Sequence, residues 1–214
     1  MQCLSIARIA AAGATAAAAV LVTVLGCATG PSDDEIDAKA AAVLRASFKE
    51  QGQAKLDRLT QDDTQKTCSQ YSGKAVPSEA AARIEKANLA SIKWPADGKY
   101  LGDWASGERI AQEGRGMQYS DDPASPSGAN CYACHQLAPQ ELSYGTIGPS
   151  LYQFGKLRGY GVEIQKYAYG KVFNSEAYNA CTTMPRFGHS KILTEQQVKD
   201  VVALLMDPAS PVNK

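Results

Sequence analysis

The sequence predicts an all-α protein with a helical N-terminal extension and a second helical region. No segment shows the sustained apolar–polar alternation of a β-strand. Apolar residues recur at helical spacing near both ends of the mature chain, and acidic or hydroxyl side chains stand where helices would begin. The 214 residues include 22 basic and 22 acidic side chains, a balance that argues against a nucleic-acid-binding protein.

The first 27 residues resemble an export signal. An alanine-rich apolar run over residues 9–25 is short for a membrane-spanning helix. The residues Val24–Cys27 resemble a lipobox, which would leave Cys27 as a lipidated N-terminus, but the small residues 26–28 also suit an ordinary signal peptidase. We expect residues 1–27 to be a signal peptide and keep Cys27 as a candidate lipidation site. No later apolar run reaches membrane length.

Residues 28–100 predict a helical extension with an interruption. Ser32 or Asp33 can cap a helix whose first turn is acidic, and apolar residues follow at helical spacing. Residues 61–77 are polar and interrupted, so we expect a break there. A second helix should then start at Ser78.

Residues 101–214 predict the second helical region. Asp103 can cap a helix that runs to about residue 114, and Gly107 within it would let another helix approach closely. Near the end of the chain, Thr194–Gln197 forms a capping box, and apolar residues follow it at positions i, i+3, i+4 and i+7. Helices therefore precede and follow the segment that holds the reactive residues of the chain.

The most informative motif is Cys131-Tyr132-Ala133-Cys134-His135. Two thiols three positions apart can add to the two vinyl groups of one haem, and the imidazole that follows can then bind the iron. A redox-active thiol pair or half of a zinc site is the alternative, but zinc would need further Cys or His ligands and the chain has only two histidines. The motif predicts one covalently bound haem c, attached to Cys131 and Cys134, with His135 as an iron ligand.

The other face of the iron needs its own ligand. Met184 precedes Pro185 in a segment that cannot be helical, and such a segment can cross a haem face. His189 is the alternative, while Met117 and Met206 suit the role less well. Ligation by His and Met predicts low-spin iron with a raised reduction potential and no vacant position, so we expect electron transfer and no chemistry at the iron.

The surroundings of the haem are less sharply defined by the sequence. The carbonyl of Pro149 is the best candidate to accept the second N–H of His135. Three cations could pair with the haem propionates, and three tyrosines could either pack on the ring or fill the core: Lys156, Arg158, Arg186, Tyr160, Tyr167 and Tyr169.

Two cysteines remain outside the signal peptide and the haem motif. Cys68 and Cys181 lie in opposite halves of the chain. An oxidising compartment favours a disulfide between them, and the long loop that it closes would strongly constrain the unfolded chain. Two buried free thiols are the alternative.

Several segments together carry a family resemblance: Asn130–His135, Gly145–Leu151, Thr183–Gly188, the ending Leu193–Asn213, and in the extension Ala46–Lys49 and Glu85–Ala90. Through these segments the chain resembles the SoxX subunits of SoxAX cytochromes, whose haem domain is a class I cytochrome c. The resemblance spans nearly all of the mature chain. The haem motif alone would identify only a cytochrome, and the combination with the methionine segment and the extension is more specific.

The resemblance implies a class I cytochrome c domain at residues 101–214, located in the periplasm. It implies a heterodimer with a SoxA-like haem subunit, which together join thiosulfate oxidatively to a cysteine of a SoxYZ-like carrier, an L-cysteine S-thiosulfotransferase activity. This chain would only transfer electrons, to a small acceptor cytochrome. Lipidation of Cys27 departs from the simplest family pattern, because it would tether the protein.

Two other functions fit the haem motif. A free-standing periplasmic electron shuttle of another pathway would gain nothing from an extension of this length, whereas a docking surface would. A haem enzyme or gas sensor would need an open iron, which high-spin spectra or ready binding of carbon monoxide would reveal.

Overall fold

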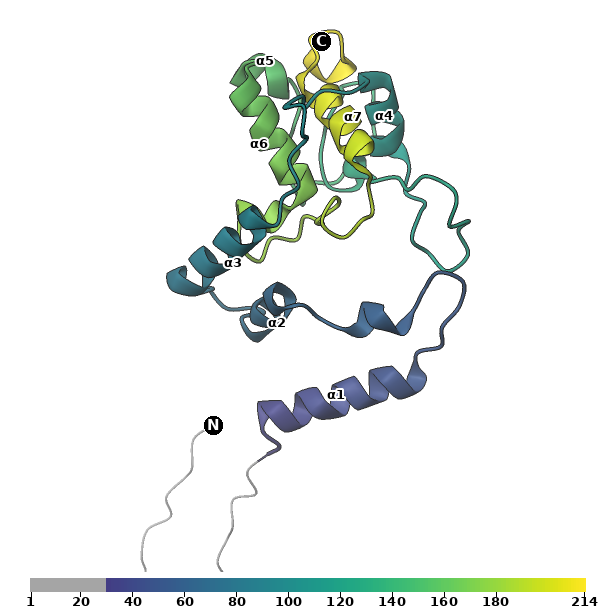
Figure 1. The fold of residues 1–214 in the computed structure, drawn as a ribbon, viewed down its shortest axis with the longest axis vertical. Helices are drawn as coiled ribbons and strands as arrows, with labels where there is room; N and C mark the ends of the chain where they lie inside the picture. Colours follow the sequence, from purple (N-terminus) through teal and green to yellow (C-terminus); the bar gives the residue numbers. More distant parts are fainter. Residues whose placement is uncertain (1–29) are drawn as a thin grey trace, which may run out of the picture. The chain divides into compact units, whose positions relative to one another are not determined.

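All regular secondary structure in the part that the computed structural model describes, residues 30–214, is helical (Figure 1). The signal peptide and Cys27 lie outside the described residues. The helices are α1 (Asp33–Ser47), α2 (Asp63–Gln70), α3 (Ser78–Ala90), α4 (Trp104–Gln112), α5 (Phe154–Arg158), α6 (Val162–Phe173) and α7 (Glu195–Met206). Short 3₁₀ turns are η1 (Leu56–Leu59), η2 (Cys131–Ala133), η3 (Ser175–Ala177) and η4 (Pro211–Asn213). Over these residues the predicted all-α class is confirmed.

The chain divides after Ala42 into two units, the second of which is Val43–Lys214. None of the helices between residues 30 and 214 combines the length and the apolar character needed to cross a membrane. The second unit holds the haem motif, Met184 and both remaining cysteines, so residues 43–100 of the extension fold together with the C-terminal region.

Helix α1 begins where the sequence predicts. The Ser32 hydroxyl accepts a hydrogen bond from Glu35 N at 3.3 Å, and a Glu35 carboxylate oxygen accepts one from Ser32 N at 2.8 Å. Acidic side chains in the first turn and Arg45 in the last turn suit the helix dipole. None of the residues of α1 is buried.

Helix α2 forms inside the segment that the sequence predicts to be a break, so that prediction is wrong for residues 63–70. A capping box starts the helix: the Asp62 side chain accepts from Gln65 N at 2.8 Å, and the Gln65 side chain accepts from Asp62 N at 2.9 Å. None of its residues is buried. Because α2 lacks an apolar stripe, hydrophobic periodicity could not reveal it. Helix α3 starts at Ser78, as predicted.

Helices α5 and α6, which follow the haem motif, were not predicted from the sequence. The N-cap of α6 is Gly161, which has no side chain to accept a capping hydrogen bond. The buried residues of α6 are crowded into its second half instead of recurring along one face: Ala168, Tyr169, Gly170, Val172 and Phe173. Neither a start signal nor an amphipathic stripe therefore marks this helix in the sequence.

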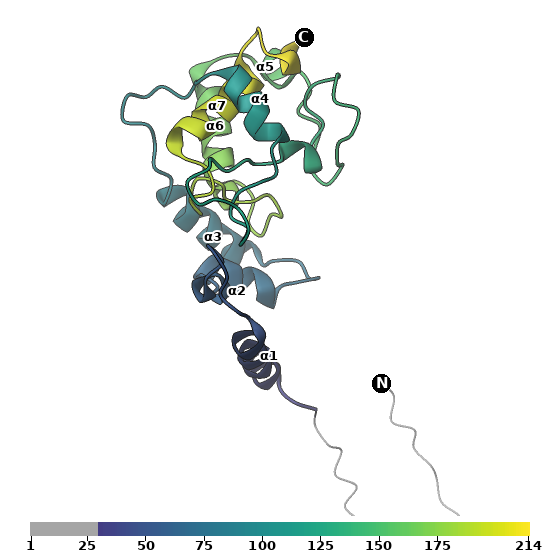
Figure 2. The ribbon, with the colours of Figure 1, turned by 90° about the vertical axis from the view of Figure 1, so that its right-hand side faces the viewer.

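Helix α7 lies at the centre of the core and contacts α4, α5 and α6 (Figures 1 and 2). The predicted capping box is present, because the Thr194 hydroxyl accepts from Gln197 N at 3.3 Å while the Gln197 side chain accepts from Thr194 N at 3.0 Å. Every residue from Val198 to Met206 is buried. Burying each large apolar side chain of this stretch stabilises the fold by about 1.5–3 kcal/mol.

Helices α4 and α7 cross at very close range. Gly107 is buried in α4, and a Cβ atom at this position would overlap the carbonyl oxygen of Asp200 in α7. The residues just before α4 bond to the same part of α7. Asp103 N donates to the Asp200 carboxylate at 2.9 Å, and Gly102 N donates to Lys199 O at 3.0 Å. The close approach predicted for Gly107 is confirmed.

An aromatic cluster joins the extension to the haem-motif region. The rings of Trp94 and Tyr100 lie 5.9 Å and 5.6 Å from the ring of Tyr169, measured between centroids. Tyr169 is fully buried, and its hydroxyl donates to Lys93 O at 3.0 Å. Of the two roles open to Tyr169 in the sequence, the structure gives it the core.

We expect Gly107→Ala to lower the free energy of unfolding by about 1–3 kcal/mol, because the added methyl group must push α4 away from the Asp200 carbonyl. Alanine normally favours a helix over glycine, so the sign of the effect separates crowding from helix propensity. Guanidinium unfolding followed by circular dichroism measures it. Gly161→Ala is the control, since a Cβ there meets no atom within 4 Å; equal stability of the two variants would contradict the close crossing.

Candidate haem site

The haem motif folds into a single tight turn. Cys134 N and His135 N both donate to Cys131 O, at 3.1 Å and 2.9 Å, and Asn130 precedes the turn in the left-handed conformation with φ 45°. Cys131 and Cys134 are not joined to each other or to another cysteine. One turn of chain is the separation that two thiols need to reach neighbouring vinyl groups of one porphyrin.

The imidazole of His135 is held through one of its two nitrogens. Nδ1 lies 2.7 Å from the carbonyl oxygen of Pro149, the group expected from the sequence. Because a carbonyl can only accept, Nδ1 must carry the proton, and the lone pair of the neutral ring is then on Nε2. This is the tautomer that a histidine needs to bind a metal through Nε2.

Residues 145–151 wrap the motif and fix that carbonyl. Gly145 N, Gly148 N and Leu151 N donate in turn to the carbonyl oxygens of Tyr132, Cys134 and Gln136, at 2.8, 2.9 and 2.8 Å. A Cβ atom at Gly148 would overlap the His135 ring, so the main chain passes directly against the imidazole. Only glycine allows this contact.

The thiol of Cys131 faces the core. It packs against the main hydrophobic cluster, and burial raises its pKa to about 12. The raised pKa favours the neutral thiol at ordinary pH, the form that is less reactive toward oxidants.

Met184 lies in the irregular chain between η3 and α7, as its position before Pro185 predicts. It is half-buried and packs against the same core cluster as Cys131. Its main chain is held on both sides, because Ser175 Oγ donates to Met184 O and Met184 N donates to Thr182 Oγ1 at 3.3 Å.

The other candidate ligands lie in different surroundings. His189 Nδ1 lies 3.3 Å from Ser91 Oγ, in the turn that follows α3. Met206 is buried in the core at the end of α7. Met117 lies in a loop, where its carbonyl accepts from Arg58 of the extension. Of the four candidates, Met184 is the one that packs from an irregular segment against the core cluster that Cys131 also contacts.

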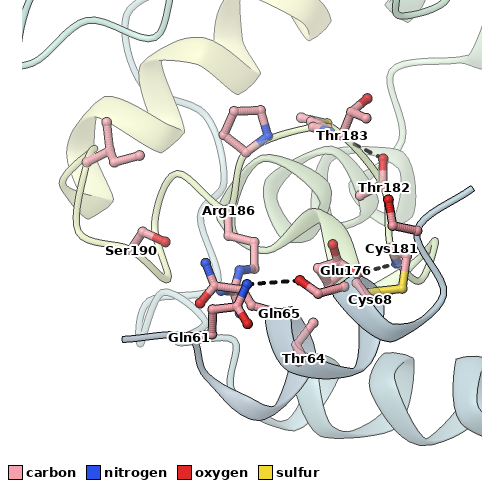
Figure 3. Close-up of a pocket in the computed structure, with 15 residues that line it drawn as sticks. Gln61, Thr64, Gln65, Cys68, Glu176, Cys181, Thr182, Thr183, Arg186 and Ser190 are labelled. Atoms are coloured by element: carbon pink, nitrogen blue, oxygen red, sulfur yellow. Dashed lines mark hydrogen bonds between the residues drawn. A yellow bond between two sulfur atoms is a disulfide. The ribbon is translucent and has the colours of Figure 1, made fainter. Parts of the chain in front are cut away.

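A pocket beside Met184 has a volume of about 690 Å³. It lies between α2 and the segment around Met184, and Cys68, Cys181 and Arg186 are among its lining residues (Figure 3). Cys131, Cys134 and His135 do not line it. The structure thus places Met184 and the haem motif on one core without enclosing them in one cavity.

The exposed apolar side chains of the residues that follow the motif also bear on haem binding. Four apolar side chains between residues 142 and 162 are exposed, among them Leu142 at 91%, Ile147 at 74% and Leu157 at 74%. Ile147 adjoins Gly148, which lies against the His135 ring, so an apolar group bound beside this ring would meet an exposed apolar residue.

Cys68 and Cys181 form a disulfide with an S–S distance of 2.02 Å, across 113 residues of sequence (Figure 3). It connects α2 of the extension to the segment that holds Met184. The disulfide favoured by the sequence is therefore present, and the alternative of two free thiols is not.

The structure shows different surroundings for the cations proposed to pair with the haem propionates and for the tyrosines proposed to pack on the ring. Arg186 forms an ion pair with Asp62 at 2.6 Å, and its side chain is only 11% exposed, so it is not available to a propionate. Arg158 lies over the Phe154 ring at 4.9 Å, while Lys156 is exposed. Tyr160 and Tyr167 are each 38% exposed.

Burial lowers the pKa of His189, an effect to which Arg186 adds and which Asp62 opposes. The unfolded chain binds a proton here near pH 6.5 while the folded chain resists it, so this residue favours unfolding as the pH falls below about 6.5. We expect His189→Gln to reduce the loss of stability between about pH 7.5 and pH 5.5. Denaturant midpoints at both pH values test this; parallel curves for variant and wild type would refute it.

No protein-family model matches the chain. Over 159 residues, the chain is 40% identical to a protein of Aquifex aeolicus (strain VF5) named "Uncharacterized lipoprotein". The match covers 72% of this chain and 73% of that protein. The aligned part is long enough to include most of the unit that holds the disulfide and the haem motif. The chain therefore belongs to the same family as this Aquifex aeolicus lipoprotein.

Proposed function

We propose that this chain is a monohaem c-type cytochrome that accepts and passes on electrons. Cys131 and Cys134 would bind the porphyrin through thioether bonds, and His135 and Met184 would be the two protein ligands of the iron. The observation that carries the proposal is the hydrogen bond between His135 Nδ1 and Pro149 O, since it leaves Nε2 to bind a metal. When bound, the haem supplies one-electron oxidation and reduction.

The residues around the motif support this role by orienting and shielding. Pro149 O fixes both the tautomer and the rotation of the His135 ring, and Gly148 allows the main chain to lie against it. The exposed apolar side chains from Leu142 to Val162 would exclude water from the bound group. A dry, well-oriented site favours fast electron transfer because little has to rearrange when the charge changes.

Ligation by Met184 would leave the iron closed to substrates. A haem iron needs only two protein ligands, because the porphyrin supplies four nitrogens. His189 stays the alternative to Met184, because the contact of its Nδ1 with Ser91 leaves Nε2 open to a metal. A thioether ligand stabilises ferrous iron more than a second imidazole does, which suits an electron acceptor.

Within this class we propose the role of a SoxX-like subunit. The chain would form a heterodimer with a SoxA-like haem subunit, accept the electrons released when thiosulfate is joined to a SoxYZ-like carrier, and pass them to a small cytochrome. The proposal rests on the resemblance of the haem, methionine and C-terminal segments. It agrees with the disulfide, since in residues 30–214 no thiol remains outside the haem motif to take part in sulfur chemistry.

A free-standing electron shuttle is the second candidate, and one observation favours it. The extension makes its polar contacts with the chain's own C-terminal region, through Cys68, Asp62 and Ser91 among others. Its presence therefore does not require a partner subunit.

The place of action that we propose is the cell envelope, with the chain anchored by a lipid on Cys27. The Aquifex aeolicus relative is named a lipoprotein. The lipobox-like residues Val24–Cys27 provide the matching chemistry here. A lipid on Cys27 would keep the haem domain in the envelope while leaving it free to meet small soluble partners.

We expect the exported protein, produced with a cytochrome c maturation system, to gain the mass of one haem. Replacing both Cys131 and Cys134 by alanine should abolish that gain, because no thioether can form. Mass spectrometry under denaturing conditions measures it. The matched control replaces Cys68 and Cys181 by serine, which should keep the haem mass; a wild-type chain without added mass would rule out the cytochrome.

In the native organism, we expect a tagged chain to be recovered from the membrane fraction together with a second haem protein in equal amount. Cys27→Ser should move the chain to the soluble periplasmic fraction without loss of that partner. Fractionation, haem staining and quantitative mass spectrometry give the result. A chain that is always monomeric would favour the free shuttle, and an unchanged location of the variant would exclude the lipid anchor.

A further inference from the structure

The contacts between the extension and the rest of the second unit concentrate on one short segment. Six polar or covalent links run from residues 62–91 to residues 174–189, the segment that contains Met184. They join Asp62 to Arg186, Cys68 to Cys181, Glu85 to Ala180, Asn88 to Asn174, Ser91 to Asn174, and Ser91 to His189. The extension therefore contacts the region of the proposed axial ligand far more than its place in the sequence would suggest.

Two of these links come from the α2 region and flank Met184 closely. The disulfide holds Cys181, three residues before the methionine, and the ion pair holds Arg186, two residues after it. Arg186 Nη2 lies 2.6 Å from Asp62 Oδ2, and the Arg186 side chain is 11% exposed. Both links can therefore restrain the position of the methionine main chain.

The junction between α2 and this segment depends on these links instead of on apolar packing. Helix α2 has no buried residue, and the pocket of about 690 Å³ separates α2 from residues 181–186 (Figure 3). On the α2 side, where packing is this sparse, removing one polar link should loosen the segment, because few other contacts restrain it on that side.

The opposite side of the segment is held by η3. The Ser175 hydroxyl donates to Met184 O, and the buried Glu176 carboxylate accepts from Cys181 N at 2.6 Å. Cys181 itself has a positive φ of 59°, a conformation that a residue with a side chain adopts only when its surroundings impose it. The segment is thus fixed between η3 and α2, with no regular secondary structure of its own.

We propose that α2 of the extension acts as a clamp on the axial-ligand segment, with Asp62 and Cys68 as positioning residues that keep Met184 on the iron. This inference rests on the proposed function, since it requires a haem with Met184 as a ligand. The thioether–iron bond is a weak one, so its occupancy depends on how often the segment moves away. By restraining both sides of Met184, the clamp lowers the population of the open state, in which the iron can bind an external ligand.

The test uses the full-length holoprotein and the binding of carbon monoxide to the ferrous haem, which requires Met184 to leave. Asp62→Asn removes the charge that pairs with Arg186 but keeps a good N-cap for α2, because asparagine and aspartate cap helices about equally well. A second variant replaces Cys68 and Cys181 by serine, and a third combines both changes. We expect carbon monoxide to bind about tenfold faster to each of the first two variants, and faster still to the third.

Asp97→Asn is the matched control. It cuts the ion pair with Lys199, whose side chain is also 11% exposed, but touches no residue of the Met184 segment. Its rate should stay within about twofold of the wild-type rate. The visible absorption band of thioether-bound ferric haem provides a second readout, which should be lost at lower denaturant concentration in the clamp variants than in the control.

The possible outcomes distinguish a failure of the clamp from a failure of the proposed ligation by Met184. If Asp62→Asn and the disulfide variant bind carbon monoxide no faster than Asp97→Asn, the clamp is wrong while the cytochrome stands. If the wild-type protein binds carbon monoxide as readily as Met184→Ala, the proposed ligation itself is wrong. Should the disulfide variant fail to fold, Asp62→Asn decides alone, because it leaves the helix cap and the disulfide in place.

Discussion

The close crossing of α4 and α7 at Gly107 is the contact on which the rest of the second unit depends. At this crossing the Asp200 carbonyl lies against Gly107, which has no side chain. The Asp200 carboxylate accepts a hydrogen bond from Asp103 N at the start of α4. The end of α4 then carries the haem motif: Ile110 O accepts from Ala129 N and Glu113 O accepts from Asn130 N, at 2.9 and 3.0 Å. The position of the Cys131 turn is thus set by a contact between two helices.

Further hydrogen bonds connect the Cys131 turn to the residues that follow it. Residues 145–151 bond to the motif and bring the Pro149 carbonyl to His135, while the second proposed ligand comes from a segment without regular structure. The two sides of the site therefore differ in how they are built. The contacts that hold His135 come from residues close to it in the sequence. The segment of Met184 is held by α2 and η3, which lie far apart in the chain.

This difference explains how much could be predicted from the sequence. The capping box of α7, the helix start at Asp103, the close approach at Gly107 and the Pro149 carbonyl all follow from residues that are near neighbours in the chain or have one dominant use. The Asp62–Arg186 pair spans 124 positions and uses two residue types that are common on surfaces, so no local pattern indicates it. Likewise α2, which buries nothing, has no periodic signal. The extension suggested a docking surface in the sequence, and the structure shows that its residues 62–91 are linked to the C-terminal region of the same chain.

The disulfide has a consequence for how the protein matures. Besides this pair, two cysteines follow the signal peptide and must stay reduced if they are to react with vinyl groups. Four thiols can join into two bridges in three ways, and each of the three oxidises both Cys131 and Cys134. If the motif binds haem as proposed, the chain needs in one compartment oxidation at Cys68 and Cys181 and protection from it at the haem motif. The raised pKa of the Cys131 thiol, which keeps it protonated and less reactive toward oxidants, provides part of that protection.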